Sequence, residues 1–290
     1  MKILFLHLSD AHFKEDTKIY DVNPNAIISS LAQMEKFDEC VLIFSGDIVY
    51  SGAVNEYKTA GSFIGRLVKG ISERYINKKH VNVYMVPGNH DVLVKNPERG
   101  SDSIKSYYTD RKVDEHYYNE LSQLSNFYTF ANRNRCFEKA KNIEVKRLAF
   151  GKFIVKINLI NTAPFSLLGS DNGDKGLHYL PEKEFDKFGF NYYESYTISV
   201  MHHGPEWFSD NNKNALYEKM YDSSDLIFVG HEHFSLSEKK EINGRKKVSI
   251  SSGLALYGTK TEHGFNAIIL NTDKHYMHGF KFTYNGSIYK

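Results

Sequence analysis

The sequence has little cysteine, and its charges nearly cancel. Cys40 and Cys136 are the two cysteines among 290 residues, and two lone thiols make no disulfide framework. Lysine and arginine number 37 against 35 aspartates and glutamates, a formal charge of +2. No overall charge therefore demands nucleic acid or an anionic membrane as a partner. We expect a protein of a reducing compartment, the cytoplasm.

Long hydrophobic runs are also missing. The N-terminal apolar run Ile3–Leu6 is four residues long and is followed by His7 and Asp10, so it is neither a signal peptide nor a membrane span. The chain shows no internal repeat and no low-complexity linker. With 41% hydrophobic and 14% aromatic residues, it can bury a large core. We expect one domain over residues 1–290 and no membrane contact.

The most informative stretch present is residues 81–91, VNVYMVPGNHD. Its apolar, β-branched first half predicts a buried strand. Pro87 and Gly88 end that strand, because proline donates no ladder hydrogen bond and glycine allows a sharp turn. Asn89, His90 and Asp91 follow directly. A strand that delivers an amide, an imidazole and a carboxylate at one spot is a common way to present metal ligands and an acid or base.

Four other predicted strands end in the same way. Residues 2–10 lead to Ser-Asp-Ala-His, 41–45 to Gly-Asp, 196–201 to His-His-Gly-Pro, and 226–229 to Gly-His-Glu-His. Asp10 and His12 lie two residues apart, where alternate side chains of a strand point the same way and can share a cation. One such element has little weight, whereas five in this order indicate a site.

The first third of the chain alternates strands with helical patterns, at residues 25–38 and in the segment after Asp47. This order predicts a layered α/β fold with a largely parallel sheet, whose functional groups lie beyond the carboxyl ends of its strands. The second half indicates mostly strands, with an arm at 153–161, a short helix at 181–189, a hairpin around Asn243-Gly244, and final strands at 267–271 and 280–284.

Residues 101–142 break this alternation and predict an insert of one or two helices, with apolar positions at helical spacing. The first interpretation is a surface layer whose aromatics pack on the core, and we favour it because such stripes are usually core. The second is a lid or substrate rim, in which Arg111, Arg133 and Arg135 contact phosphate and the tyrosines stack on bases.

Seven oxygen- or nitrogen-bearing side chains stand at the predicted strand ends: Asp10, His12, Asp47, Asn89, His202, His231 and His233. Seven ligands are too many for one ion and suit two that share a bridging carboxylate. Aspartate, asparagine and histidine together favour Mn, Zn, Fe or Co, and the absence of cysteine from this set disfavours a structural zinc site. We expect two divalent ions, with manganese favoured.

As a set, these motifs resemble the calcineurin-like metallophosphoesterase superfamily over residues 10–233. The resemblance implies a four-layer αββα sandwich of two mixed β-sheets flanked by helices. It also implies roles for individual residues: Asp10, His12 and His233 as ligands of a first metal, Asp47 as the bridge, and Asn89, His202 and His231 as ligands of a second. His203 stays unassigned, and His202 is the less certain of the ligands because relatives differ in which adjacent histidine coordinates.

Two such cations, about 3.5–4 Å apart, would lower the pKa of a shared water and stabilise in-line attack on phosphorus. His90, beside Asn89 but outside the ligand set, can protonate the leaving oxygen. Asp91 either orients that imidazole or caps the turn. Both residues are candidate catalytic groups.

The substrate class follows from further resemblance. The protein serine/threonine phosphatases of the superfamily carry Gly-Asn-His-Glu and extra arginines, whereas this chain has Asp91 and no arginine directly after it. The SDAHF, GDIVYSG and GNHDV elements are more similar to bacterial phosphodiesterases and repair nucleases. We expect a phosphodiesterase or nuclease acting on a nucleotide or nucleic-acid ester. The alternatives are a small-molecule phosphomonoesterase and a non-catalytic metal-bound interaction domain. A further domain or partner protein supplying specificity is also compatible with the sequence.

Overall fold

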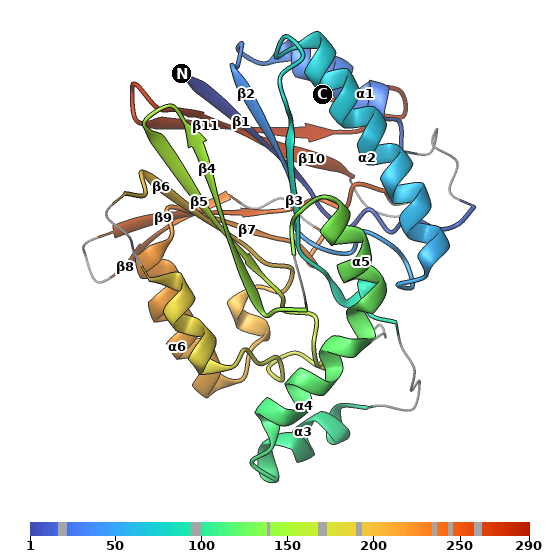
Figure 1. The fold of residues 1–290 in the computed structure, drawn as a ribbon, viewed down its shortest axis with the longest axis vertical. Helices are drawn as coiled ribbons and strands as arrows, with labels where there is room; N and C mark the ends of the chain where they lie inside the picture. The colour runs from blue at the N-terminus through green and yellow to red at the C-terminus, as the bar shows by residue number, and fades with distance from the viewer. Residues whose placement is uncertain are drawn as a thin grey trace.

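Two β-sheets form the centre of the protein in a computed structural model that describes residues 1–16, 22–93, 100–137, 140–167, 173–189, 193–233, 237–242, 246–257 and 263–290. The first sheet has the order β11-β10-β1-β2-β3 and the second β4-β5-β6-β7-β9-β8. Both are mixed, because antiparallel β10, β11, β4 and β8 flank parallel strands. The α/β fold of two mixed sheets flanked by helices is thus confirmed (Figure 1).

The strands of the first sheet are β1 (Lys2–Leu8), β2 (Glu39–Phe44), β3 (Asn82–Met85), β10 (Gly264–Asn271) and β11 (Tyr276–Thr283). Those of the second sheet are β4 (Ile143–Phe150), β5 (Phe153–Ile160), β6 (Tyr196–Val200), β7 (Leu226–Val229), β8 (Ser237–Ile242) and β9 (Lys246–Ser252). The expected hairpin of β8 and β9 is present, although its turn at Asn243-Gly244 lies outside the described residues.

The core between the sheets follows from the two-residue period of the strands. In β5, Val155, Ile157 and Leu159 join the hydrophobic cluster that the first sheet also lines, while the next residue, Ile160, joins the cluster on the other face of the second sheet. Strand β5 thereby contributes to both apolar layers.

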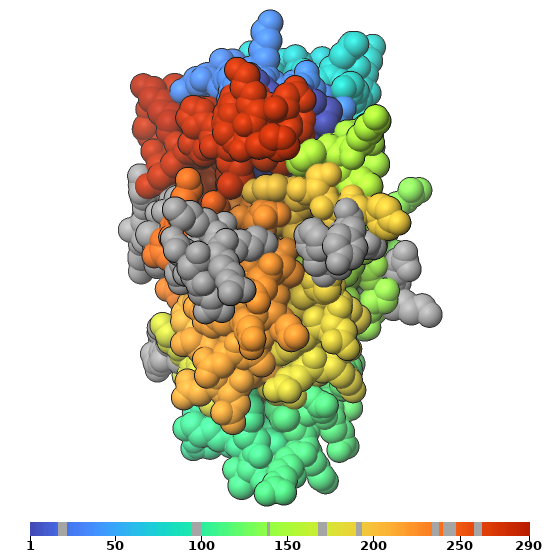
Figure 2. All heavy atoms as spheres, turned by 90° about the vertical axis from the view of Figure 1, so that its left-hand side faces the viewer, coloured from blue at the N-terminus to red at the C-terminus, as the bar shows by residue number. Residues whose placement is uncertain are grey.

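Helices cover the outer faces of both sheets (Figure 1). Helices α1 (Pro24–Ser30) and α2 (Val54–Arg74) pack on the first sheet, and α2 buries Phe63, Leu67 and Ile71 along one side. Helix α6 (Asp210–Ser223) packs on the second sheet. In Figure 2, which faces the second sheet and α6, the C-terminal strands lie at one end and the helices that follow residue 100 at the other.

Two helix predictions need correction. The helix expected at 25–38 ends at Ser30 and continues as a 3-10 turn, η1 (Leu31–Gln33), and Met34 is already extended. The second half was expected to be mostly strand, but α6 joins β6 to β7. Parallel neighbours need such a crossover, and α6 was missed because its polar sequence leaves few buried apolar residues to mark a face.

The insert contains three helices rather than one or two: α3 (Ser101–Thr109), α4 (Val113–Glu120) and α5 (Ser125–Arg133), with the 3-10 turn η3 (Leu121–Leu124) before α5. The 3-10 helix η4 (Glu182–Phe188) occupies the place of the short helix expected at 181–189. The insert packs its aromatics on the core, as the favoured interpretation expects: Tyr117 joins the cluster on the outer face of the second sheet, and Phe127 and Phe130 of α5 join the cluster that the first sheet lines. Tyr117 is fully buried and donates a hydrogen bond to the carbonyl of Asn161 at 2.9 Å.

That contact gives a stability prediction. Tyr117→Phe should lower the free energy of unfolding by about 1–3 kcal/mol, because it leaves a buried carbonyl without its donor. Chemical denaturation of the variant and the wild type measures the change. Tyr193→Phe is the matched control, since Tyr193 is 78% exposed, and it should change stability by less than about 0.5 kcal/mol. Equal stabilities for wild type and Tyr117→Phe would contradict the anchoring role.

Candidate metal centre

The turns after β1, β2, β3, β6 and β7 meet at one end of the two sheets. Backbone hydrogen bonds tie them together, from the Asp10 amide to the Gly46 carbonyl at 3.1 Å and from the Gly230 amide to the His202 carbonyl at 3.0 Å. All seven expected ligands stand on these turns. Five of them have positive φ: Asp10 51°, His12 46°, Asp47 49°, His231 72° and His233 57°. Such backbone strain gathers where side chains must be aimed for function.

Glycines let the turns approach closely. A Cβ on Gly88 would lie 2.1 Å from Asp47 Oδ1, and one on Gly46 would lie 2.3 Å from His202 Nδ1. No side chain fits at either position without moving a ligand. The glycines in the Gly-Asp and Gly-Asn-His-Asp motifs are therefore needed for space.

The first cluster contains Asp10, His12 and His233, whose donor atoms all lie within 4.8 Å of one another. His233 Nε2 is 3.2 Å from Asp10 Oδ1. Burial opposes ionisation of Asp10, but the contact with His233 and the charge of His202 outweigh it and hold the pKa of Asp10 below its ordinary value. A buried carboxylate facing two imidazoles fits a divalent cation.

The second cluster contains Asn89, His202 and His231. Asn89 Oδ1 lies 3.0 Å from His202 Nε2 and 3.1 Å from His231 Nδ1, and the two histidine nitrogens are 3.3 Å apart. His202 Nδ1 donates to the Ser45 carbonyl at 2.8 Å, so Nδ1 carries a proton and Nε2 is the nitrogen that faces the cluster. A histidine whose other nitrogen donates to a carbonyl is the usual arrangement of a metal ligand.

The carboxylate of Asp47 lies between the clusters. Its Oδ2 is 3.8 Å from His12 Nε2, and its Oδ1 is 3.4 Å from His202 Nε2. One carboxylate thus faces a ligand of each expected ion, which fits the bridging position. The structure brings all seven side chains together and separates them into two groups around Asp47, so the donor set and its geometry fit two divalent cations.

The charges of the cluster are mutually dependent. Burial disfavours the ionised form of Asp47, but the positive field of His202 prevails and lowers the pKa of Asp47. Burial likewise disfavours charged His202, but Asp47 prevails and raises the pKa of His202 to about 9. Burial and the charge of His202 lower the pKa of His231 to about 3. Bound cations would take over the role of the protonated imidazole.

His90 stands beside the first cluster without belonging to the seven ligands. Its ring centroid is 4.6 Å from that of His12, and its backbone amide donates to Asp47 Oδ1 at 2.9 Å. Its Nδ1 contacts the Tyr50 carbonyl at 2.7 Å. Because a carbonyl only accepts, Nδ1 carries a proton, and Nε2 is the atom left for chemistry.

Asp91 does not orient the His90 imidazole. Its carboxylate accepts from the amides of Gly88 at 2.9 Å, Ile48 at 3.1 Å and Val49 at 3.3 Å, and from the Tyr57 hydroxyl at 2.9 Å. Of the two roles expected for Asp91, these contacts match the turn cap, and none of them reaches the His90 imidazole. Its contacts instead join the turn that carries Asp47 to the turn that carries Asn89.

The adjacent His203 is fully buried and packs behind the second cluster. Its Nδ1 lies 3.1 Å from Thr162 Oγ1, its ring centroid is 4.1 Å from that of His178, and Nε2 has no hydrogen-bond partner among the residues that the structure describes. The structure thus favours His202 over His203 as the histidine that faces Asn89 and Asp47.

The arginines expected at a substrate rim lie elsewhere. Arg133 and Arg135 line a hollow of about 450 Å³ with α2 and with His80 and Val81, which precede β3. Asn89, one of the seven expected ligands, follows the other end of that strand. The rim assignment of this arginine pair is therefore wrong. Arg111 follows α3 and is exposed.

Sequence reasoning missed the groups that hold the ligands. Ser9 donates to Asp10 Oδ2, Ser45 Oγ donates to Ser9 Oγ at 2.9 Å, and His7 Nε2 lies 2.7 Å from Ser45 Oγ. This buried line supports Asp10 from behind. The serines directly before Asp10 and before Gly46-Asp47 were a readable signal, whereas the carbonyls of Ser45 and Tyr50 that orient His202 and His90 carry no sequence signature.

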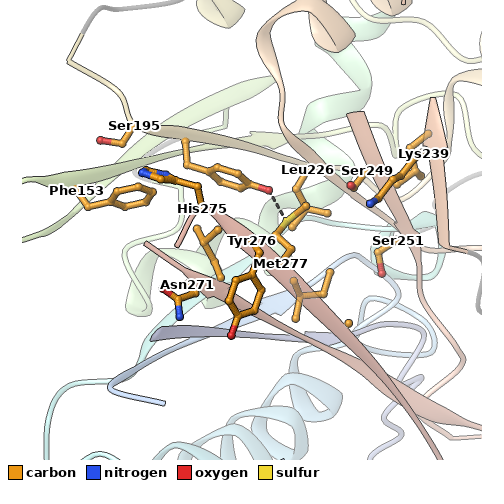
Figure 3. A pocket seen from close by; sticks show the side chains of 15 residues that line it. Phe153, Ser195, Leu226, Lys239, Ser249, Ser251, Asn271, His275, Tyr276 and Met277 are labelled. Atoms are coloured by element: carbon orange, nitrogen blue, oxygen red, sulfur yellow. Dashed lines mark hydrogen bonds between the residues drawn. The ribbon is translucent and has the colours of Figure 1, made fainter. Parts of the chain in front are cut away.

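A cavity of about 490 Å³, lined by residues of both sheets, lies away from this centre (Figure 3). Phe153, Tyr196 and Leu226 line it, and they begin β5, β6 and β7, whereas the ligands follow the opposite ends of β6 and β7. The Tyr196 hydroxyl donates to the Met277 thioether there (Figure 3). This cavity is therefore separate from the metal centre.

The family model of the calcineurin-like phosphoesterases matches residues 3–235. The chain belongs to this family, and it is a metal-dependent phosphoester hydrolase whose family implies a dinuclear centre of divalent ions. No curated protein matches the chain. Within the described residues, no helix combines the length and apolar character needed to cross a bilayer.

Solved structures show the same fold at low sequence identity. A dimetal phosphatase from Danio rerio is 12% identical with a TM-score of 0.52, covering 96% of this chain and 95% of its own. GAP50, described as the anchor in the inner membrane complex of Plasmodium, is 12% identical with a TM-score of 0.51, covering 99% of this chain and 86% of its own. Identities this low establish the architecture alone.

The shared carboxylate gives the prediction for this centre. Asp47→Asn should lower both metal content and turnover, the latter by roughly 100-fold or more, since even groups that only support a ligand contribute 10–100-fold. Metal analysis after dialysis and initial rates with a nitrophenyl phosphoester measure the two effects. Asp110→Asn, at the exposed end of α3, is the control. Two metals per chain with near-normal turnover in Asp47→Asn would contradict the bridging assignment.

Proposed function

We propose that this protein is a phosphodiesterase or nuclease that hydrolyses nucleotide or nucleic-acid phosphodiesters with two manganese ions. The observation that carries the proposal is the position of the arginine side chains. A phosphomonoester is a dianion near neutral pH and a diester a monoanion, so a monoesterase gains more from arginines that bind the phosphate in a bidentate way. Arg133 and Arg135 line the distant hollow, and Arg147 pairs with Glu194. The alternative, a small-molecule phosphomonoesterase, would need arginines at the phosphate, and the positions of these three arginines do not support it.

When bound, the two cations would supply an activated water and charge stabilisation at phosphorus. The chain's residues provide the rest. Asp47 lies between both clusters, and the Nδ1 proton of His202, held by the Ser45 carbonyl, keeps Nε2 directed at the second cluster. The choice of manganese follows from a donor set of carboxylate, amide and imidazole groups without thiolate.

In this proposal His90 serves the leaving group. The Tyr50 carbonyl fixes its ring, and the Asp47 carboxylate fixes its backbone through the His90 amide. Nε2 is then the atom that can donate a proton to the departing oxygen. His90 is not one of the seven expected ligands, although its ring nitrogen lies within 4.8 Å of the donor atoms of His12 and Asp47.

A substrate panel tests the function. The purified chain with Mn²⁺ should hydrolyse bis-p-nitrophenyl phosphate, and a cyclic nucleotide or a DNA strand, faster than p-nitrophenyl phosphate. Parallel reactions with Zn²⁺, Co²⁺ and Fe²⁺ test the metal. The double variant Arg133→Ala/Arg135→Ala is a matched control and should leave every rate unchanged. Faster hydrolysis of the monoester would favour the monoesterase, and no hydrolysis with bound metal would favour a non-catalytic interaction domain.

A second prediction concerns His90→Ala, which should keep both metals and the fold while turnover falls by roughly 10²–10⁴-fold, the usual contribution of a general acid. The loss should be smaller for nitrophenolate, a leaving group that needs no proton, than for an alkoxide. Rates for both kinds of ester, with metal analysis of the same samples, test this. Equal losses for both esters would show that His90 positions the substrate and does not transfer a proton.

A further inference from the structure

Tyr50 is an exposed aromatic side chain beside the metal centre. It follows the Gly-Asp motif after β2, and 46% of its surface is exposed. Few large hydrophobic residues in the described part of the chain are comparably exposed: Val54, Tyr193, Tyr276 and Ile288 are the others. Burying an aromatic ring stabilises a fold, so a ring left open at a catalytic centre is available to a ligand.

The ring lies on the His90 side of the centre. Its centroid is 5.4 Å from that of His90 and 6.4 Å from that of His12. The backbone of the same residue holds His90 through the 2.7 Å hydrogen bond to Nδ1. The Tyr50 ring therefore lies next to the histidine that serves the leaving oxygen, and a group attached to that oxygen would lie near the ring.

A positive charge accompanies the ring. Lys14 Nζ lies 4.1 Å from the centroid of the Tyr50 ring. Around His231 the environment is different: the Trp207 ring is 4.2 Å from that of His231, and Trp207 Nε1 donates to Glu232. Beyond it, a cavity of about 330 Å³ is lined by Glu206, Glu232 and Glu238 together with Lys175. An anionic substrate is therefore better accommodated on the Tyr50 side.

We propose that Tyr50 and Lys14 form a leaving-group subsite, in which the Tyr50 ring stacks on an aromatic group of the substrate and Lys14 attracts its negative charge. The proposal rests on the proposed function, under which that aromatic group is a nucleobase. Stacking a base on an aromatic side chain tolerates any base and commonly contributes roughly 5- to 100-fold in affinity. The subsite would make this enzyme prefer phosphodiesters that release a nucleoside.

Binding measurements test the subsite without requiring turnover. Adenosine 5′-monophosphate and ribose 5-phosphate share their phosphate and sugar and differ by the base. With the Mn²⁺-loaded protein, the wild type should bind the first more tightly by roughly 5- to 100-fold. Tyr50→Ala should remove this difference, Tyr50→Phe should keep it, and Tyr193→Ala should have no effect. Lys14→Gln should weaken both ligands alike, since it removes charge and no stacking surface.

Hydrolysis of two phosphodiesters distinguishes a failure of the subsite from a failure of the proposed function. The substrates are the methyl phosphodiesters of adenosine 5′-monophosphate and of ribose 5-phosphate, and in both the sugar oxygen on phosphorus is the leaving group. The wild type should release adenosine faster than ribose, and Tyr50→Ala should slow only the adenosine compound. If neither diester is hydrolysed while the binding difference holds, the proposed function fails and the subsite stands. If Tyr50→Ala leaves the binding difference intact, or weakens both ligands equally, the subsite is wrong.

Discussion

Two buried carboxylates lie at the end of both sheets: Asp10 contacts His233, and Asp47 contacts His202. The rest of the centre depends on keeping these two carboxylates charged. Ionised carboxylates are costly to bury unless opposite charge lies beside them. Here His202 and His233 supply that charge, and bound cations would supply more of it. The positive φ of both aspartates and the close approach of Gly88 to Asp47 follow from this requirement, because each carboxylate must face the shared space.

The fold holds the carboxylates in place by hydrogen bonds between the turns that carry the expected ligands, and not only by packing of each turn on the core. Asp91 is the clearest case, since its carboxylate accepts from three amides on two turns and from the Tyr57 hydroxyl of α2. Burial and nearby Asp47 raise the pKa of Asp91 to about 7, against the effect of those donors. Asp91 is thus a structural joint between the turns of Asp47 and Asn89.

The sequence was sufficient to predict which ligands would converge, because each is specified locally. A buried apolar run followed by a glycine turn places a polar residue at a strand end, and parallel neighbours bring those ends together. The residues that each of these side chains contacts were not predictable in the same way. Whether Asp91 caps a turn or orients His90, and whether Arg133 faces the metals or α2, depends on where distant segments pack. Helix α6 was missed for a related reason, since its polar sequence defines no clear apolar face.

Tyr50 shows why residues that choose a substrate are harder to find than residues that perform chemistry. A metal ligand must have a particular atom, so its residue type identifies it, whereas a stacking surface needs only a ring in the right place. In the sequence, Tyr50 is one of 20 tyrosines. In the structure, its carbonyl holds His90 and its ring lies open beside that histidine. Catalysis and selection would then share one residue, with the backbone serving the first and the side chain the second. A change of side chain at this position could alter the leaving group that the enzyme prefers while the carbonyl goes on holding His90.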